Sequence, residues 1–305
     1  MSRRSSSSSA TEIKLALILL FPLLDGACAG MCKEFGFVHI PKTGGTTIVE
    51  GLSRCSTQLK QNLLQTQNLS PDLHHQSAFR QRRRFGAARW DAAYTFSVVR
   101  SPFSWAVSMF FYAMETHCHR DGSPKGSRME NFVNKTDGVI PACSYARELL
   151  DPSHPGKGRA YHKSHIALFT AWLVEHDELA RVTGRPFLTP NLIAIGGLEP
   201  DGTQIAWLSA AKGSRGALSV THVIKLEDSP DFNRHADCAQ LEAVVCNQSA
   251  PGNGTSPAAF VKVVKASGHA NSTAYYSPRA CEVIQRRLAA DFEAFGYNST
   301  CPVMS

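Results

Sequence analysis

The chain has 305 residues, 43% of them hydrophobic, which is enough for one large α/β domain or two smaller ones and excludes disorder of the whole chain. Its 32 Lys and Arg residues outnumber 25 Asp and Glu residues, and the net charge is +7. This balance disfavours a basic partner and favours an acidic one, such as a nucleic acid, an acidic polysaccharide or a phosphorylated cofactor.

The N-terminus has the pattern of a targeting segment. Two arginines and a serine run precede the apolar stretch IKLALILLFPLL, and an Ala-x-Ala cleavage pattern follows at Ala27 and Ala29. The apolar stretch is short for a membrane span, which needs about 20 residues. We expect residues 1–29 to be a cleaved signal peptide, with an uncleaved signal anchor as the alternative, and residues 30–305 to form a single domain. Membrane association is expected only if the segment is an anchor.

Asparagine and cysteine usage both indicate the secretory pathway. Six of ten asparagines begin an N-x-Ser/Thr glycosylation sequon: Asn68, Asn134, Asn247, Asn253, Asn271 and Asn298. Nine cysteines become eight if cleavage removes Cys28, and no C-x-x-C zinc spacing occurs among them. Disulfides are therefore favoured over metal or catalytic thiols. Local spacing suggests the pairs Cys118–Cys143, Cys238–Cys246 and Cys281–Cys301.

Strand and helix patterns alternate along the chain. The stretch FVHIPKTGGTTIVEGL, residues 37–52, predicts a strand, a glycine turn and a helix. A second β-rich run covers Ala93–Arg100 and leads into a helix from Ser104, whose side chain is a plausible cap. A third β-rich run lies at Val220–Phe232, and helical patterns cover KSHIALFTAWLVEHDEL and the C-terminal SPRACEVIQRRLAADFEAFGY. This order predicts an α/β fold with a mainly parallel sheet covered on both faces.

The glycine turn has the composition of an anion site. Glycines let the backbone approach an anion closely, and the amides at a helix N-terminus point at it. A lysine adds a mobile positive charge, and threonines add hydroxyl donors. The order is not that of G-x-x-x-x-G-K-[ST], so a small phosphate group is favoured over a nucleoside triphosphate with magnesium, and no metal is expected. The candidate ligands are Lys42, Thr43, Gly44, Gly45, Thr46 and Thr47.

The end of the second strand offers another phosphate site. Arg100 ends the strand, and Ser108 lies eight residues further on, inside the following helix. Arginine binds phosphate through two parallel hydrogen bonds, and a serine on a helix can donate to the same group. Because the carboxyl ends of parallel strands share one edge of the sheet, we expect this site to lie beside the glycine turn.

These motifs carry a family resemblance. IPKTGGTT resembles the 5′-phosphosulfate loop of the sulfotransferases that use 3′-phosphoadenosine 5′-phosphosulfate (PAPS), and VVRSPFSWAVSMFFY resembles their 3′-phosphate element. VIKLED is similar to their third strand, and HANSTAYYSP with DFEAFGY resembles the C-terminal block of the Golgi carbohydrate sulfotransferases. The resemblance covers most of residues 35–297 and implies a P-loop NTPase-like sulfotransferase fold.

The resemblance implies roles for these residues. It puts Lys42 on the bridging oxygen of the leaving group, Thr43 to Thr47 around the 5′-phosphate, and Arg100 with Ser108 on the 3′-phosphate. Two positions depart from the family pattern. Ser101 replaces the usual Asp or Asn after the arginine, and Trp105 stands where many members have a second arginine.

A base for the attacking hydroxyl completes the chemistry. A histidine titrates near neutrality, and related enzymes often carry one in a context similar to LHHQSAFR. We therefore predict His75 as the catalytic base beside Lys42, with His74 and His269 as alternatives.

The expected acceptor is a carbohydrate hydroxyl in the Golgi lumen, on a polysaccharide of acidic character. The basic run Arg80–Arg89 is either a groove for this acceptor or a solvated helix face. Nucleic acid is disfavoured by the secretory signals. Protein-tyrosine sulfation and an inactive protein that binds acidic glycans are the alternative functions.

Overall fold

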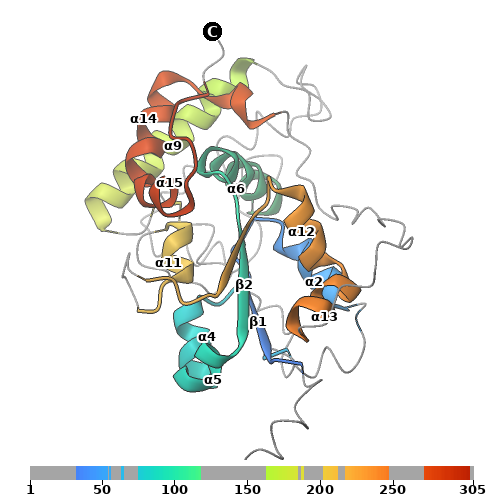
Figure 1. The fold of residues 1–305 in the computed structure, drawn as a ribbon. Helices are drawn as coiled ribbons and strands as arrows, with labels where there is room; N and C mark the ends of the chain where they lie inside the picture. The colour runs from blue at the N-terminus through green and yellow to red at the C-terminus, as the bar shows by residue number, and fades with distance from the viewer. Residues whose placement is uncertain are drawn as a thin grey trace, which may run out of the picture.

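The computed structural model describes residues 32–53, 55, 63–64, 75–117, 163–184, 187–188, 202–211, 217–246 and 271–302. Its centre is a parallel sheet of the strands β1 (Phe35–Val38), β2 (Tyr94–Val99) and β3 (His222–Lys225), in the order β1-β2-β3. Phe37 pairs with Phe96, and Phe96 pairs with His222. The predicted α/β class is therefore confirmed as an open parallel sheet of three strands flanked by helices (Figure 1).

One face of the sheet is covered by three helices. These are α2 (Gly45–Ser53), α12 (Ser229–Ala236) and α13 (Cys238–Val245), which lie together on one side of the strands in Figure 1. Alternate residues of β1 and β2, such as Phe35 and Phe96, form a core cluster with apolar side chains of these helices. This alternation follows from the strand repeat of two, which sends successive side chains to opposite faces.

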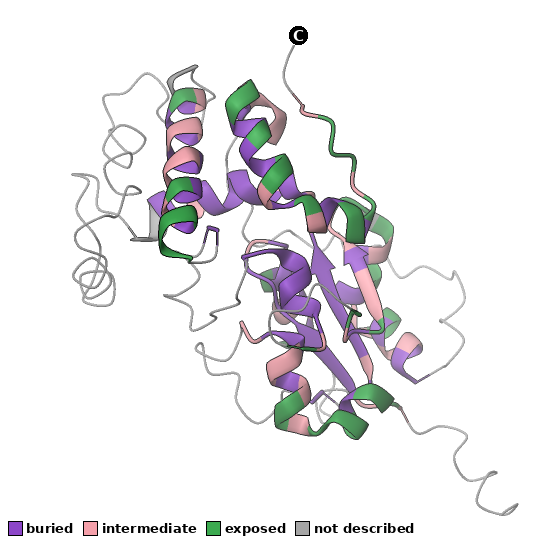
Figure 2. Ribbon diagram, turned by 90° about the vertical axis from the view of Figure 1, so that its left-hand side faces the viewer, coloured by how far each residue is buried: buried purple, intermediate pink, exposed green. Residues whose placement is uncertain are grey.

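The larger core cluster lies on the other side of the strands. Val38 and Val99 contribute to it from the sheet. Most of its other members come from the helices α6 (Pro102–His117), α9 (Lys163–Thr183), α11 (Gln204–Leu208), α14 (Pro278–Arg287) and α15 (Ala289–Phe295). The short helices α4 (Ala78–Phe85) and α5 (Ala87–Ala92) precede β2, and a 3-10 turn, η2, covers Ser272–Tyr275. Strands β1 and β2 are therefore almost entirely buried, whereas β3 is mostly of intermediate burial (Figure 2).

Helix α6 begins earlier than the sequence predicted. It starts at Pro102, and the amide of Trp105 donates to the carbonyl of Ser101 over 2.8 Å. Proline is favoured at a first helical position because its fixed φ suits the helix and its missing N–H has no intrahelical acceptor there. Ser104 is therefore not the cap, and its hydroxyl is hydrogen-bonded to that of Ser272 over 2.8 Å.

Disulfides link the segments that flank β1 and α2 to helix α13, which follows β3 and α12. The described cysteines form the bonds Cys32–Cys246, Cys55–Cys238 and Cys281–Cys301. The predicted Cys281–Cys301 pair is confirmed, and the predicted Cys238–Cys246 pair is wrong. Helix α13 separates its two cysteines by eight residues, or about 12 Å at 1.5 Å per residue, whereas a disulfide needs α-carbons within about 7 Å. The pair Cys118–Cys143 lies outside the described residues.

The disulfides indicate an oxidising, secretory-type compartment. Asn271 and Asn298, the sequon asparagines within the described residues, are both exposed, as glycosylation requires. No helix in the described ranges combines the length and apolar character that crossing a membrane takes. The predicted signal segment, residues 1–29, lies outside those ranges.

Candidate functional site

The loop between β1 and α2 is held by hydrogen bonds to its own backbone. The Thr43 hydroxyl donates to the carbonyl of Ile40 over 2.9 Å, and the Trp105 indole N–H donates to the carbonyl of Pro41 over 2.8 Å. Trp105 is fully buried at the start of α6. Trp105, one of the two departures from the sulfotransferase pattern, therefore links the loop to the second strand–helix unit. The Thr43 hydroxyl is occupied within the loop, whereas Thr46 is exposed at the start of α2.

Packing favours glycine at both loop positions, and the backbone conformation also favours it at Gly44. Gly44 has φ +88°, and a Cβ there would lie 2.8 Å from Leu226 Cδ1. A Cβ on Gly45 would overlap the ring of His39. The close approach of His39 and Leu226 to the loop thus disfavours a side chain at these two positions.

Lys42 adopts a left-handed conformation, with φ 67°. This region costs a residue other than glycine roughly 1–2 kcal/mol, and such strain is concentrated at functional sites. The ammonium lies over the ring of Tyr112 on α6, 4.7 Å from its centroid. The loop therefore directs its one lysine toward the helix that follows the second strand.

Arg100 lies beside this loop at the carboxyl edge of the sheet. Its Nη1 donates to the carbonyl of Lys42 over 3.3 Å. The side chain of Gln204, on α11, accepts from the Arg100 amide and donates to the Arg100 carbonyl, each over 2.8 Å. Asp291, on α15, in turn accepts from the amides of Gln204 and Ile205. A chain of hydrogen bonds from the C-terminal helices thus positions the backbone of the predicted phosphate-binding arginine.

The charge on Arg100 is partly desolvated. Burial lowers the pKa of its guanidinium, and the nearby Glu227 carboxylate acts in the opposite direction. Charge that is withdrawn from water interacts more strongly with a bound anion, because the local dielectric is low. Arg100 therefore has the environment of a site for a phosphate group.

Glu227, in the turn after β3, joins three segments at the same edge. Its carboxylate accepts from the amide of Ser101 and from the hydroxyl of Tyr297, each over 2.9 Å. Lys225, the last residue of β3, lies over the Tyr297 ring, 4.9 Å from its centroid. Burial, followed by the charge of Glu227, raises the pKa of Tyr297, so its hydroxyl stays protonated and continues to donate.

The sequence identified only part of this arrangement. Lys42 and Arg100 are brought together as predicted, and Ser108 is buried within α6, two turns after its start. Gln204, Glu227 and Tyr297 were missed as individual residues. Glu227 and Tyr297 lie inside the segments VIKLED and DFEAFGY, which carried the resemblance, whereas nothing in the sequence around Gln204 indicated its role.

His75 lies next to the residue that begins the loop. Its Nδ1 is 3.2 Å from the carbonyl oxygen of His39, and the two imidazole rings are 4.3 Å apart between centroids. His39 is buried and follows β1 directly, three residues before Lys42. The structure therefore places the predicted base against the first strand of the site. The alternative histidines, His74 and His269, lie outside the described residues.

The basic run divides between paired and exposed arginines. Arg82 forms two hydrogen bonds with Asp91, and Arg89 forms two with Glu34. Arg83 and Arg84 are exposed on α4. Two of the five arginines of this predicted acceptor surface are thus held in ion pairs.

The segments at this edge of the sheet carry three kinds of group that bind phosphate: the amides at the start of α2, the Lys42 ammonium and the Arg100 guanidinium. Comparisons with protein-family models, with curated proteins and with solved structures find no match to the chain.

Proposed function

We propose that the protein is a PAPS-dependent sulfotransferase with a P-loop NTPase-like fold, which transfers a sulfuryl group to a carbohydrate hydroxyl in the Golgi lumen. One observation carries the proposal. Arg100 directly follows β2, Lys42 lies in the loop after the adjacent parallel strand β1, and Arg100 Nη1 donates to the backbone carbonyl of Lys42 over 3.3 Å. This is the edge where open α/β sheets bind ligands, and two separate cations there suit a nucleotide with phosphates at two positions.

The loop residues would hold the 5′-phosphosulfate end. The amides at the start of α2 and the exposed Thr46 hydroxyl bind the 5′-phosphate, and the Lys42 ammonium neutralises the bridging oxygen as the S–O bond breaks. Arg100, assisted by Ser108, binds the 3′-phosphate. The fixed position of Arg100, given by Gln204, lowers the cost of ordering it when the cofactor binds.

His75 would act as the general base. The acceptor hydroxyl oxygen attacks sulfur, its proton passes to the imidazole, and the nucleotide leaves with the electrons of the broken S–O bond. His39 supports this role, since its carbonyl oxygen lies 3.2 Å from Nδ1 of His75. With Nδ1–H donating to that carbonyl, Nε2 keeps the lone pair that accepts the proton.

The exposed Arg83 and Arg84 support an acidic polysaccharide as the acceptor. Sulfation of protein tyrosine uses the same cofactor and compartment, and it is the alternative enzymatic activity. The departures at Ser101 and Trp105 favour a second alternative, an inactive protein that binds acidic glycans.

Titration calorimetry with 3′-phosphoadenosine 5′-phosphate, alongside ATP, tests the proposal. We expect the 3′-phosphate nucleotide to bind more tightly. Lys42→Ala and Arg100→Ala should each weaken its binding by about 10- to 100-fold, the loss of one charge-assisted contact. Arg279→Ala is the matched control, because Arg279 is an exposed arginine on α14 that pairs with Glu282.

Sulfate transfer to a panel of glycans and tyrosine peptides then separates the alternatives. His75→Ala should reduce turnover and leave nucleotide affinity nearly unchanged. A folded protein that binds sulfated glycans but shows no PAPS-dependent sulfate transfer would refute the enzymatic proposal and support the binding protein.

A further inference from the structure

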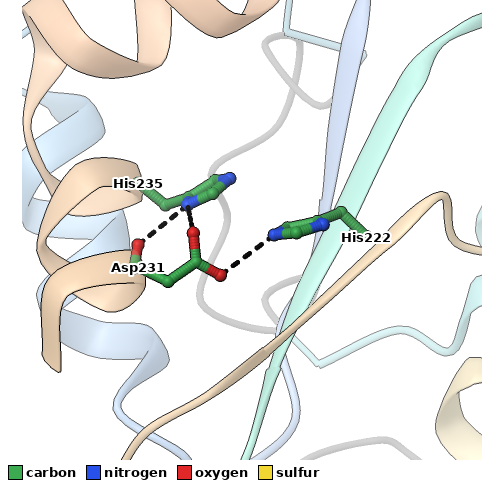
Figure 3. A group of neighbouring side chains, drawn as sticks. All are labelled: His222, Asp231 and His235. Atoms are coloured by element: carbon green, nitrogen blue, oxygen red, sulfur yellow. Dashed lines mark hydrogen bonds and ion pairs between the residues drawn. The ribbon is translucent and has the colours of Figure 1, made fainter. Parts of the chain in front are cut away.

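Two histidines and an aspartate form a cluster between β3 and α12 (Figure 3). His222 begins β3, whereas Asp231 and His235 lie one turn apart on α12. His222 Nε2 is 3.0 Å from Asp231 Oδ2, and His235 Nδ1 is 3.5 Å from Asp231 Oδ1. Each residue offers a ligand atom, and the three atoms lie within 4.8 Å of one another.

These distances are near those of a metal site. Tetrahedral zinc with bonds of 2.0–2.1 Å separates its ligand atoms by about 3.3 Å. His222 and His235 approach different oxygens of Asp231 at distances close to this value, and the side chain of His222 is 40% exposed, so it can turn to bring the three ligand atoms around one ion. The two imidazole rings are stacked, 5.1 Å apart between centroids and 18° from parallel.

The surroundings of His235 supply the support that a metal-binding imidazole needs. Its side chain is buried, and its Nε2 lies 2.8 Å from the hydroxyl of Tyr94. In the structure Nδ1–H donates to the carbonyl of Asp231 over 2.9 Å. On metal binding Nδ1 becomes the ligand, and Nε2–H donates to Tyr94. Such an outer hydrogen bond is found on nearly every histidine that binds a metal.

We infer that His222, Asp231 and His235 bind one divalent transition-metal ion of the zinc type. Two imidazoles and a carboxylate are the ligands that zinc takes in sites with a further position open to water. Hard cations are disfavoured because magnesium and calcium take oxygen ligands. The inference stands apart from the proposed function, since these residues have no part in it.

The position of the cluster indicates what the metal would do. His222 lies at the amino-terminal end of β3, away from the carboxyl edge that carries Lys42 and Arg100. The metal would join β3 to α12. Helix α12 packs on α2 so closely that a Cβ on Gly51 would overlap the carbonyl of Ala236. The metal would thus stabilise the strand–helix unit against which the phosphate-site helix rests.

Calorimetric titration of the metal-free, disulfide-intact protein with zinc chloride tests the inference. We expect one high-affinity zinc ion per chain. His222→Ala and Asp231→Asn should each weaken its binding by at least about 10-fold, because losing even an outer hydrogen-bond partner of a ligand costs about 10- to 100-fold. Asp228→Asn is the matched control, since Asp228 is an exposed carboxylate just before α12. His222 is only half buried, so its variant is expected to fold.

Thermal unfolding gives a second readout on the same proteins. Zinc at about a hundred times its Kd should raise the Tm of the wild type by roughly 5–10 °C and that of His222→Ala much less. The inference is overturned if the wild type binds no zinc, or if zinc binds the His222→Ala and Asp231→Asn variants as tightly as the wild type.

Discussion

A comparison of the four tryptophans can measure how much one hydrogen bond in the phosphate-site loop contributes to stability. All four are buried, but their indole N–H groups differ. Trp105 donates to Pro41 and Trp90 donates to Ser219, whereas the N–H groups of Trp172 and Trp207 meet no acceptor within the described part of the chain. Replacing each by Phe removes a similar apolar area but a hydrogen bond in only two of the four cases.

The variants are expected to differ in stability because some of them leave a backbone carbonyl without its indole donor. In Trp105→Phe the Pro41 carbonyl loses its indole donor inside the protein, which costs about 1–3 kcal/mol. The loss of ring contacts is common to the four variants and cancels in the comparison. Trp207→Phe also removes a buried N–H without an acceptor in the described residues, so part of its packing cost is offset.

Urea unfolding of the oxidised proteins, followed by far-ultraviolet circular dichroism, measures this difference. We expect Trp105→Phe and Trp90→Phe to lose about 1–3 kcal/mol more of the free energy of unfolding than Trp172→Phe and Trp207→Phe, with unchanged m-values. If the two groups agree within about 0.5 kcal/mol, the hydrogen bond from Trp105 does not stabilise the loop. If the loop binds nucleotide as proposed, Trp105→Phe alone should also weaken that binding.

Three further predictions follow from the same structure. Gly45→Ala should destabilise the protein by about 1–3 kcal/mol, because the added methyl group overlaps the His39 ring. In the double variant with His39→Ala this loss should be relieved. If urea unfolding shows that the losses in free energy of unfolding of the two single variants simply add, the contact is refuted. Burial lowers the pKa of His176 to about 4, below its ordinary 6.5, so the free energy of unfolding should fall by roughly 3 kcal/mol as the pH drops from 6.5 to 4. His176→Gln should flatten that part of the stability–pH profile, and an unchanged slope would exclude the buried neutral imidazole. Non-reducing peptide mapping should recover Cys55 linked to Cys238, and recovery of Cys238 linked to Cys246 would contradict the structure. The Cys55→Ser/Cys238→Ser variant should lose about 2–5 kcal/mol of the free energy of unfolding.

Local patterns predicted the elements of the site because each element is defined by residues that are close in the sequence. The apolar run before Lys42 and the glycines after it lie within about ten residues of one another. The β-rich run that ends at Arg100 is a second pattern of about the same length. The rule that parallel strands align their carboxyl ends then placed Lys42 beside Arg100, and the structure confirms that they are in contact. Side-chain direction and helix length were not accessible in this way, so the start of α6 was set two residues too late.

The sequence by itself determined the alternation of strands and helices, the loop composition and the use of disulfides, since each depends on residue type and short spacing. Only the tertiary structure decided which distant segments meet. It paired Cys55 with Cys238, set Gln204 against Arg100 and gathered His222 with Asp231 and His235. These contacts depend on how α11, α12 and α13 pack against the sheet. Packing is fixed by the shape of the whole core, and no local pattern encodes it.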